Sequence, residues 1–394
     1  MPAVRFLSTP LLRSAALPFA ANGVLYGTWA ARIPEVRARC GLSEGELGLA
    51  LLGLAVGLIV AASLAGRLVA RRGALAVTRV GLVLFGVAVV GPGLATGLWS
   101  LAAVLVAVGL ASGLLDVSMN AWAADVEGAA DQQILGSCHG MFSLGGMVGA
   151  GLGALAAAAD VPLAAHLAAS GLAFAGGAWF QSRGLTGGPR RAPVEDTSGP
   201  IVALPTGPVA GLAVLACCGL IVEGAVADWG AVFLRQALGA PPATAALAFG
   251  VFSACMAAAR FGADRLTARL GDRRLLTAGA SLGAVGLALC VAAPAVPVAL
   301  AGFAALGLGF AASVPVLFRA ASRAPGLKPG VGIAAVTSSG YAGFLAGPPV
   351  LGFVAEAFGM RSAFGVLVVL AAVVALGAGP ALRAARGPAQ PQAA

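Results

Sequence analysis

Twelve long stretches of mainly apolar residues follow one another along this 394-residue chain. An α-helix needs about twenty such residues to cross the ~30 Å hydrocarbon core of a bilayer. Apolar residues make up 59% of the sequence and charged residues 10%, against about 45–50% and about 25% in soluble domains. Only short connections and one longer segment separate the stretches. The sequence therefore predicts an all-α membrane protein with twelve transmembrane helices and no soluble domain of useful size.

Turn residues, charges and capping patterns set the boundaries of the expected spans. The first is expected near Leu11–Ala31, and a polar outside loop, Arg32–Ser43, follows it. Ser43 and Glu46 form a capping box that opens the second span. An acidic loop, Asp125–Asp131, is expected between the fourth and fifth spans. The other spans are expected near Leu75–Gly93, Leu98–Ala123, Ile134–Ala158, Pro162–Gln181, Pro208–Phe233, Ala243–Gly262, Leu275–Pro294, Pro297–Phe318, Val331–Ala355 and Arg361–Pro380.

Basic residues fall unevenly on the two sides of these spans. Of the 24 Lys and Arg residues, 19 lie in the terminal segments or in even-numbered connections and 5 in odd-numbered ones. Cytoplasmic loops carry the excess of basic residues in membrane proteins. We therefore expect both termini in the cytoplasm and the chain in the inner (plasma) membrane. The formal net charge of +9 then indicates orientation, and no nucleic-acid partner is expected.

One sequence pattern occurs twice along the chain, at an offset of 198 residues. The matching positions are Ala65–Gly73 with Ala263–Gly271, Gly109 with Gly307, Gly145 with Gly343, and Gly149 with Gly347. Repeats of this kind occur in transporters built from two parallel halves. We expect two six-helix bundles, residues 1–182 and 207–387, joined by a cytoplasmic linker, 183–206, and followed by a disordered tail, 388–394.

The segment Gly262–Arg274 resembles the signature that the major facilitator superfamily carries between its eighth and ninth helices. The first-half copy departs from that signature because Gly66 stands where an acidic residue is expected. The helix-4 arginine signature and the helix-5 Gly-Pro signature of antiporters are absent, although Gly343–Gly352 contains a Gly-Pro run. The resemblance implies alternating access, with a cytoplasmic latch formed by Asp264, Arg265, Arg269, Arg67 and Arg71. The same basic residues also serve as plain positive-inside anchors.

Within the superfamily, the sequence is most similar to the fucose–proton symporter group and its bacterial inner-membrane relatives. Asp116 followed by Asn120 resembles the acid and amide of that group's helix 4. Phe142–Gly145 resembles its helix-5 motif, with Ser143 in place of Asn. The runs Trp29–Pro34, His139–Gly146 and Glu223–Trp229 resemble the inner-membrane relatives. The resemblance implies proton-coupled transport.

Asp116 and Asn120 are the first candidates for chemistry. They are four residues apart and therefore share one helix face. His139 should lie at a similar depth in the next helix, within reach of Asp116 directly or through water. An acid at membrane depth normally faces a cavity or a partner. Asp116 is expected to exchange protons, while Asn120 and His139 contact the solute or tune the acid. Alternatively, Asp116 and His139 bond each other or nearby backbone as interhelical contacts.

Three further polar residues lie inside predicted spans. Glu223 is expected to face the cavity as a second proton-exchanging acid. Asp228, five residues on, points away from Glu223 and could pair with Arg32 or Arg235. Asn22 is a candidate hydrogen-bonding contact for the solute.

Small residues are expected to let the helices approach closely. Gly145 and Gly149 form one ladder and Gly343 and Gly347 another. Pro348 should bend its helix and free backbone carbonyl groups.

The function predicted from these features is secondary active transport of a small solute by a monomer. We expect proton-coupled symport of a sugar-like or other polar metabolite, driven by the proton gradient. No cofactor, metal or enzyme activity is expected, because the chain has one lysine, two histidines and no phosphate-binding loop. Proton-driven export of amphipathic compounds or drugs is one alternative. A non-transporting membrane sensor or scaffold is another.

Overall fold

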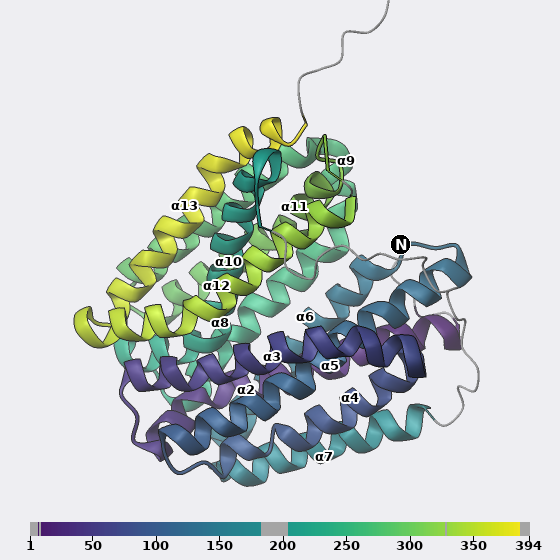
Figure 1. The fold of residues 1–394 in the computed structure, drawn as a ribbon. Coiled ribbons are helices and arrows are strands. Elements are labelled where there is room, and N and C mark those ends of the chain that lie inside the picture. The colour runs from purple at the N-terminus through teal and green to yellow at the C-terminus, as the bar shows by residue number, and fades with distance from the viewer. Residues whose placement is uncertain (1–6, 8, 183–203, 328, 387–394) are drawn as a thin grey trace, which may run out of the picture.

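A computed structural model describes residues 7, 9–182, 204–327 and 329–386, and every regular element in these ranges is helical. Figure 1 labels the helices. Their bounds are α2 Pro10–Cys40, α3 Glu44–Arg72, α4 Ala74–Ala88, η1 Gly91–Gly93, α5 Leu98–Ala130, α6 Leu135–Ala158, α7 Leu163–Ser182, η2 Gly207–Val209, α8 Ala210–Leu238, α9 Pro242–Ala292, α10 Val296–Phe310, α11 Ser313–Ser322, α12 Pro329–Phe358 and α13 Met360–Ala384.

Ten helical segments of the described residues are long and apolar enough to cross a membrane. They comprise α3, α4 with η1, α5, α6, η2 with α8, the two parts of α9, α10 with α11, α12 and α13. Helix α2 is less apolar, because polar and small residues such as Asn22 and Thr28 interrupt its central part. The apolar stretch of α7 is shorter, Leu163–Gly177.

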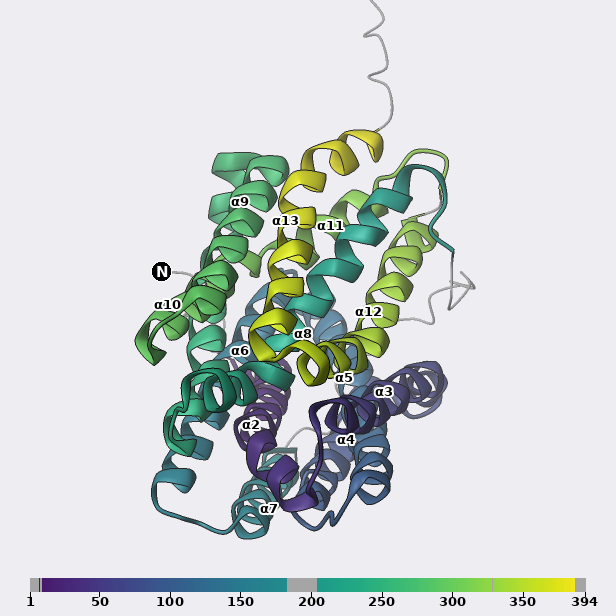
Figure 2. The same ribbon diagram turned by 90° about the vertical axis from the view of Figure 1, so that its left-hand side faces the viewer.

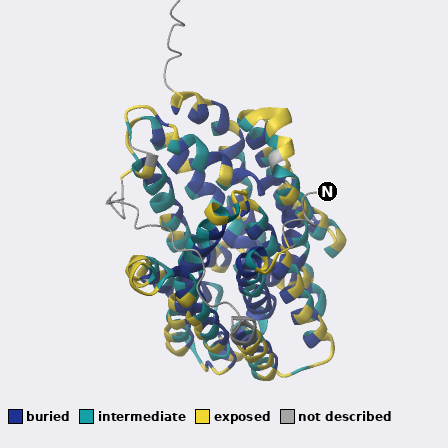
Figure 3. Ribbon diagram, turned by 90° about the vertical axis from the view of Figure 1, so that its right-hand side faces the viewer, coloured by how far each residue is buried: buried dark blue, intermediate teal, exposed yellow. Residues whose placement is uncertain are grey.

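Many residues on the outer faces of the helices are exposed (Figure 3), and large apolar residues are among them. Examples are Val80, Val87, Leu155, Val369 and Leu376, of which Leu376 is 80% exposed. A soluble protein of this size would bury most such side chains against a core. A lipid environment accommodates them, so the surface agrees with a multi-pass membrane protein.

The outside loop predicted for Arg32–Ser43 is wrong for most of its length, because α2 remains helical to Cys40. Ile33, Val36 and Cys40 are buried at a helical spacing, so packing extends the helix beyond its apolar centre. Gly41 ends it in the left-handed region, at φ +66°. The capping box of Ser43 and Glu46 is confirmed at the start of α3.

The acidic loop predicted for Asp125–Asp131 is also wrong, since α5 continues to Ala130. The carboxylate of Glu127 accepts hydrogen bonds from the backbone N–H groups of Ile134 (2.8 Å) and Leu135 (3.1 Å). These N–H groups belong to the start of the next helix and have no partner within it. An acidic residue predicted to lie in a loop therefore caps α6 from the last turns of α5.

The single span predicted for Pro297–Phe318 is divided into α10 and α11 at residues 311 and 312. Pro315 has no N–H to donate to the carbonyl group of Ala311, which favours a break there. Conversely, the spans predicted for Ala243–Gly262 and Leu275–Pro294 form one helical run, α9. Gly271 interrupts this run with φ +74°, a conformation that glycine adopts without strain.

Helices α2–α7 lie together in the lower part of Figure 1, and α8–α13 lie together above them. Within the first group α2 packs on α6, α3 on α5, and α4 on α5 and α7. Within the second, α9 packs on α10 and α13, and α8 on α12 and α13. The main contacts between the groups join α6 to α9 and α3 to α12 (Figure 2).

Glycine contacts reproduce the 198-residue offset in three dimensions. A Cβ atom on Gly109 would overlap the carbonyl oxygen of Leu54, and one on Gly307 would overlap that of Phe252. Both partners in the second contact lie 198 positions after their counterparts in the first. Corresponding helices of the two groups therefore pack through corresponding residues.

The packing role predicted for the other glycines holds for three of the four. Added Cβ atoms on Gly145 and Gly149 would overlap backbone carbonyl oxygens of α2, those of Ala20 and Val24. On Gly343 such an atom would lie 2.8 Å from the carbonyl oxygen of Cys217. Gly347 has only ordinary contacts of 3.6 Å or more, so close packing does not require glycine there.

Gly149→Val should destabilise the protein, because its side chain must push α6 away from α2. Overpacking a well-packed interior typically costs about 1–3 kcal/mol. Gly151→Val on the same helix is the matched control, since an added Cβ there meets no atom within 4 Å. Thermal unfolding in detergent should show a lower midpoint for the first variant than for the second. Equal midpoints would contradict the close contact.

Candidate functional site

Arg260 of α9 connects three helices inside the protein. Its Nη2 atom lies 3.8 Å from Oε2 of Glu223 on α8, and both side chains are largely buried, at 16% and 14% exposure. Its Nη1 atom donates to Oγ of Ser143 on α6 at 2.8 Å and to the carbonyl oxygen of His139 at 3.4 Å. The guanidinium group thus bonds an acid of its own half of the chain and a hydroxyl group of the other half.

Small residues on α6 bring α9 close enough for this contact. A Cβ atom added to Gly140 would lie 2.8 Å from the ring of Phe261, and one added to Gly146 would lie 3.0 Å from Oγ of Ser253. Larger side chains at these positions would separate the two helices. Glycines of α6 therefore permit close packing of α9 on one face of the helix and of α2 on the other.

The ion pair between Arg260 and Glu223 is loose, and one atom of Glu223 has no hydrogen-bond partner. That atom, Oε1, is fully enclosed, whereas an optimal charge-assisted hydrogen bond would be shorter than about 3 Å. An enclosed carboxylate oxygen without a donor costs free energy. Glu223 can therefore gain stabilisation from a proton or from the hydroxyl group of a solute.

Sequence reasoning missed the importance of Arg260. It counts this residue among the basic residues that set orientation, although Arg260 lies inside the predicted span Ala243–Gly262. A charged residue within a span generally faces the interior and has a function. That position is the signal that could have identified it.

The predicted contact between Asp116 and His139 is not found. Nδ2 of Asn120 donates to the backbone oxygen of Asp116 at 2.8 Å and to its Oδ1 at 3.3 Å. Asp116 also acts electrostatically on Tyr341 of α12. The His139 ring instead lies edge-on to Phe19, with centroids 5.2 Å apart. The two residues are separated because α5 packs mainly on α3 and α4, whereas α6 packs on α2 and α9.

Asn22 lies in an interhelical contact. It is buried, and its Nδ2 atom points to the sulfur of Met119 on α5 at 3.8 Å. The amide therefore joins α2 to α5.

The predicted pairing of Asp228 with Arg32 or Arg235 is wrong. Arg32 is buried in α2, where its Nε atom lies 3.6 Å from Glu35 and its Nη2 atom donates to the carbonyl oxygen of Val161 at 3.2 Å. Arg235 is exposed and acts electrostatically on Glu35. Because α2 stays helical past Arg32, that side chain turns toward Glu35. Asp228 lines a small cavity between α8 and α12 instead.

The predicted latch residues lie on the surface. Arg67, Arg71, Arg265 and Arg269 are exposed, and no ion pair joins them to another side chain that the structure describes. The side chain of Asp264 lies outside the described part of the chain. Beside the interruption of α9 at Gly271, Asp272 forms an ion pair with Arg319 of α11 at 2.7 Å. The latch role stays a prediction.

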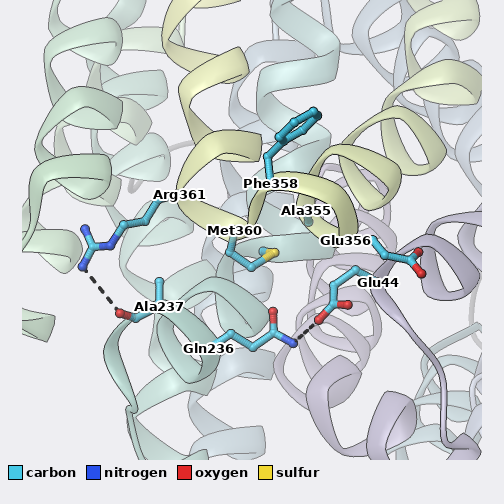
Figure 4. A pocket seen from close by; sticks show the side chains of 9 residues that line it. Glu44, Gln236, Ala237, Ala355, Glu356, Phe358, Met360 and Arg361 are labelled. Carbon is cyan, nitrogen blue, oxygen red and sulfur yellow. Dashed lines mark hydrogen bonds between the residues drawn. The ribbon is translucent and has the colours of Figure 1, made fainter.

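A polar contact region at the start of α3 also joins the two groups of helices, and sequence reasoning did not identify it. Glu44 accepts hydrogen bonds from Arg37 at 2.7 Å and from Gln236 of α8 at 2.6 Å. Glu356 of α12 accepts from the N–H group of Gly45 at 3.0 Å. Figure 4 shows Glu44, Gln236 and Glu356 around a surface pocket that Arg361 also lines.

A family model for the major facilitator superfamily matches residues 14–232 and 212–393, which together cover nearly the whole chain. The chain belongs to the major facilitator superfamily. This is a family of transporters and not of enzymes.

Relatives from three bacteria support this assignment. The chain is 32% identical over 366 residues to an uncharacterised MFS-type transporter of Yersinia pestis, covering 93% of this chain and 94% of that protein. It is 31% identical to the uncharacterised transporter y4wD of Sinorhizobium fredii, covering 95% and 98%. It is 28% identical to the membrane protein MosC of Rhizobium meliloti, covering 92% and 88%.

Solved structures with the same fold include two named transporters. A point mutant of the nucleoside transporter NupG has a TM-score of 0.74 at 12% identity, covering 95% of this chain and all of that one (100%). A D-xylose–proton symporter has a TM-score of 0.72 at 17% identity, covering 95% and 98%. Major facilitator members therefore share this arrangement of helices at very low sequence identity.

Arg260→Ala should destabilise the protein, because it leaves the carboxylate of Glu223 enclosed without a cation. Removing one partner of a buried pair costs up to about 3–5 kcal/mol. Arg269→Ala is the control, since that exposed side chain has no described partner and should change stability by about 0.5 kcal/mol or less. Thermal unfolding of both variants in detergent measures the difference. Adding Glu223→Gln to Arg260→Ala should restore part of the loss, and no restoration would contradict the pairing.

Proposed function

We propose that this chain is a secondary active transporter that moves a small polar solute together with protons by alternating access. The solute is sugar-like or another polar metabolite. The fold neighbours named as a nucleoside transporter and a D-xylose–proton symporter support this choice. We propose a monomer, because one chain contains both bundles. It lies in the inner (plasma) membrane with both termini in the cytoplasm, as the distribution of basic residues favours.

The proposed architecture has twelve spans in two six-helix bundles, residues 1–182 and 207–387. The equivalent contacts of Gly109 and Gly307, 198 positions apart, support it. In this arrangement α2 and α7 are the two spans beyond the ten apolar segments. The proposed linker, 183–206, and tail, 388–394, fall largely or wholly outside the described residues.

The observation that carries the proposal is the contact of Arg260 with Glu223 and Ser143. It places a buried acid and base where the two groups of helices meet. When Glu223 takes up a proton, its attraction to Arg260 weakens, and the guanidinium group is free to bind solute or to strengthen its bond to Ser143. A proton on Glu223 thereby changes the contact between α8, α9 and α6. Such a change is what coupling of protonation to movement of the two bundles requires.

Aromatic rings on α6 and α9, the helices of Ser143 and Arg260, suit a sugar-like solute. Tyr26 lies 6.3 Å from Phe142 and 5.8 Å from Phe249, measured between ring centroids. Phe142 directly precedes Ser143, and Phe249 lies on the same helix as Arg260. Solute sites in general combine apolar and aromatic walls with a few polar groups that fix orientation. Hydroxyl groups of the solute would bond Glu223 and Arg260 while its apolar face packs on the rings.

Asp116 with Asn120 is proposed as a second proton-exchanging site. Its electrostatic partner Tyr341 lies on α12, in the other bundle. Protonation of Asp116 would therefore also act across the interface between the bundles. His139 contributes its backbone oxygen to the binding of Arg260 rather than a titrating side chain.

The contacts of α3 with α12 are proposed to close the outer side. A Cβ atom on Gly48 would lie 2.6 Å from the carbonyl oxygen of Pro348, and Glu356 accepts from Gly45 one turn away. Both contacts involve the first two turns of α3, which the charge distribution assigns to the outside. Rocking of the bundles would break them when the outer side opens.

Proton flux in liposomes should be measured while sugars, nucleosides, amino acids and amphipathic drugs are supplied one at a time. Wild-type protein should move protons only with its solute, and Glu223→Gln should reduce this flux to background because Gln cannot exchange a proton. Glu127→Gln is the control, since its amide oxygen can still accept from the N–H groups of α6.

Two results of this assay would contradict the proposal. One is proton flux in the Glu223→Gln variant equal to that of the wild type. The other is the absence of flux with every compound, which would favour a sensor or scaffold. Flux with drugs alone, directed outward, would favour an exporter of amphipathic compounds.

Asp116→Asn in the same assay tests the second acid. We expect this variant to move fewer protons with the solute than the wild type does.

A further inference from the structure

The charge of Arg260 is permanent, whereas the charge of Glu223 is not. A guanidinium group in a protein cannot be deprotonated, but a carboxylate in a low-dielectric interior is neutralised when it takes up a proton. The side chain of Arg260 is only 16% exposed, and Glu223 is the acid that lies beside it. When Glu223 is protonated during transport, Arg260 therefore becomes a buried cation without a counter-charge, which is energetically costly.

Among the described residues, Glu223 is the one acid that pairs with Arg260. Asp228 of the same helix acts electrostatically on Tyr26 of α2 instead. His139 of α6, which Arg260 also influences, can add only positive charge. The acids on the other helices beside this region have partners of their own: Glu35 lies against Arg32, Asp116 accepts from Asn120, Asp272 pairs with Arg319 and Glu356 accepts from Gly45. A replacement counter-charge must therefore come from the solute.

The guanidinium group of Arg260 is held at one nitrogen and has N–H groups available at the others. Its Nη1 atom donates to Oγ of Ser143 at 2.8 Å and to the backbone oxygen of His139 at 3.4 Å. No hydrogen bond between described residues uses its Nε or Nη2 atom, and the contact of Nη2 with Glu223 is loose, at 3.8 Å. Two adjacent N–H groups of an arginine match the two oxygen atoms of a carboxylate. The Nε–Nη2 edge therefore suits a carboxylate group.

A single permanent positive charge favours a singly charged anion. One carboxylate balances Arg260 once Glu223 is neutral. A phosphate ester brings a charge of about −1.5 to −2 at neutral pH and would need a second cation. Arg32, another buried arginine, already lies against Glu35. The rings of Tyr26, Phe142 and Phe249 supply apolar walls for the carbon skeleton of the solute.

We propose that the solute is a hydroxylated monocarboxylate, such as a sugar acid, whose carboxylate replaces ionised Glu223 as the counter-charge of Arg260. One proton from the solution binds the carboxylate of Glu223, and one solute carboxylate binds the guanidinium group that Glu223 releases. The site is electrically neutral before and after this exchange. One proton therefore moves with each carboxylate, and the two together carry no net charge across the membrane. This inference rests on the proposed function and gives its solute a chemical class.

Matched sugars and sugar acids test this class in the liposome assay. Glucose is compared with glucuronate and gluconate, and galactose with galacturonate, because the members of each set differ chiefly in the carboxylate. A carboxylate should move protons with it, whereas its neutral counterpart should not. A pH gradient should drive uptake of the carboxylate. A K⁺ diffusion potential set with valinomycin, at equal pH on both sides, should not drive it, because the transported pair is neutral.

Binding is measured separately on the purified full-length protein in detergent, as the rise in unfolding midpoint when each compound is titrated at constant ionic strength. The solute carboxyl group stays ionised between about pH 5.5 and about pH 8.5, so the pH dependence reports the protein. Once Glu223 is ionised, the wild type should need about tenfold more carboxylate for each further unit of pH. Glu223→Gln is neutral at every pH, and its half-saturating concentration should not change with pH.

Two further variants locate the proton and the anion within the site. Asp228→Asn is the matched control for the acid, because it lies on the same helix without an ion pair to Arg260, and it should keep the pH dependence of the wild type. Arg260→Lys keeps a positive charge beside Glu223 but loses the planar fork. Its half-saturating carboxylate concentration should rise at least several-fold. Comparable unfolding midpoints without solute establish that the variants fold.

Three results would overturn the inference. The first is no response of the wild type to any of the carboxylates, and the second is uptake driven by the membrane potential alone. The third is a pH dependence of binding in Glu223→Gln equal to that of the wild type. Proton flux with neutral sugars alone refutes the carboxylate class and leaves the proposed transport intact. Carboxylate binding without any flux refutes the transport and leaves the class intact, so the two failures are distinguishable.

Discussion

The close approach of α6 to α9 is the contact on which the candidate site depends. Gly140 faces the ring of Phe261, and Gly146 faces Ser253, so α6 contributes no side chain of its own between the two helices at these positions. This proximity lets the guanidinium group of Arg260 reach Ser143 while it remains beside Glu223. A wider separation would leave Arg260 without its partner on the other half of the chain. The electrostatic contacts of Arg260 therefore depend on the close packing of α6 and α9.

The low dielectric constant of the interior explains why so few charges occur there and why each has a distinct environment. Arg260 and Glu223 compensate each other, and Asp116 has the amide of Asn120. Asp228 has neither a cation nor a hydrogen-bond donor among the described residues and opens on a cavity instead. An acid that is already compensated can release its partner when it is protonated, whereas an uncompensated buried acid is neutralised by taking up a proton itself. The two acids of α8 therefore lie in different environments, although they are five residues apart.

The two halves of the chain share their packing but not their polar groups. Gly109 and Gly307 make equivalent contacts. In contrast, the positions 198 residues before Glu223, Asp228 and Arg260 hold Leu25, Ala30 and Ala62. Asp116 likewise corresponds to Val314 in the second half. A repeated architecture thus supports an asymmetric set of charges, and this asymmetry favours a functional over a purely structural role for them.

Much of the fold could be predicted from local sequence, because the residues of each helix indicate its length and its apolar character. Ten of the predicted spans match apolar helical segments, and the glycines expected to permit close approach do so at Gly145, Gly149 and Gly343. The ends of α2 and α5 could not be predicted, because burial of Ile33 and Val36 and capping of α6 by Glu127 depend on neighbouring helices.

Sequence by itself determined the class of protein, the spans and the pairing of Asp116 with Asn120, whose spacing of four residues places them on one helix face. Only the tertiary structure decided which helix each polar face meets. It separated Asp116 from His139, placed Arg260 beside Glu223 and Ser143, and left Asp228 at a cavity. The physical reason is that contacts along one helix follow from its fixed rise and rotation. Contacts between helices depend on how all the helices pack together.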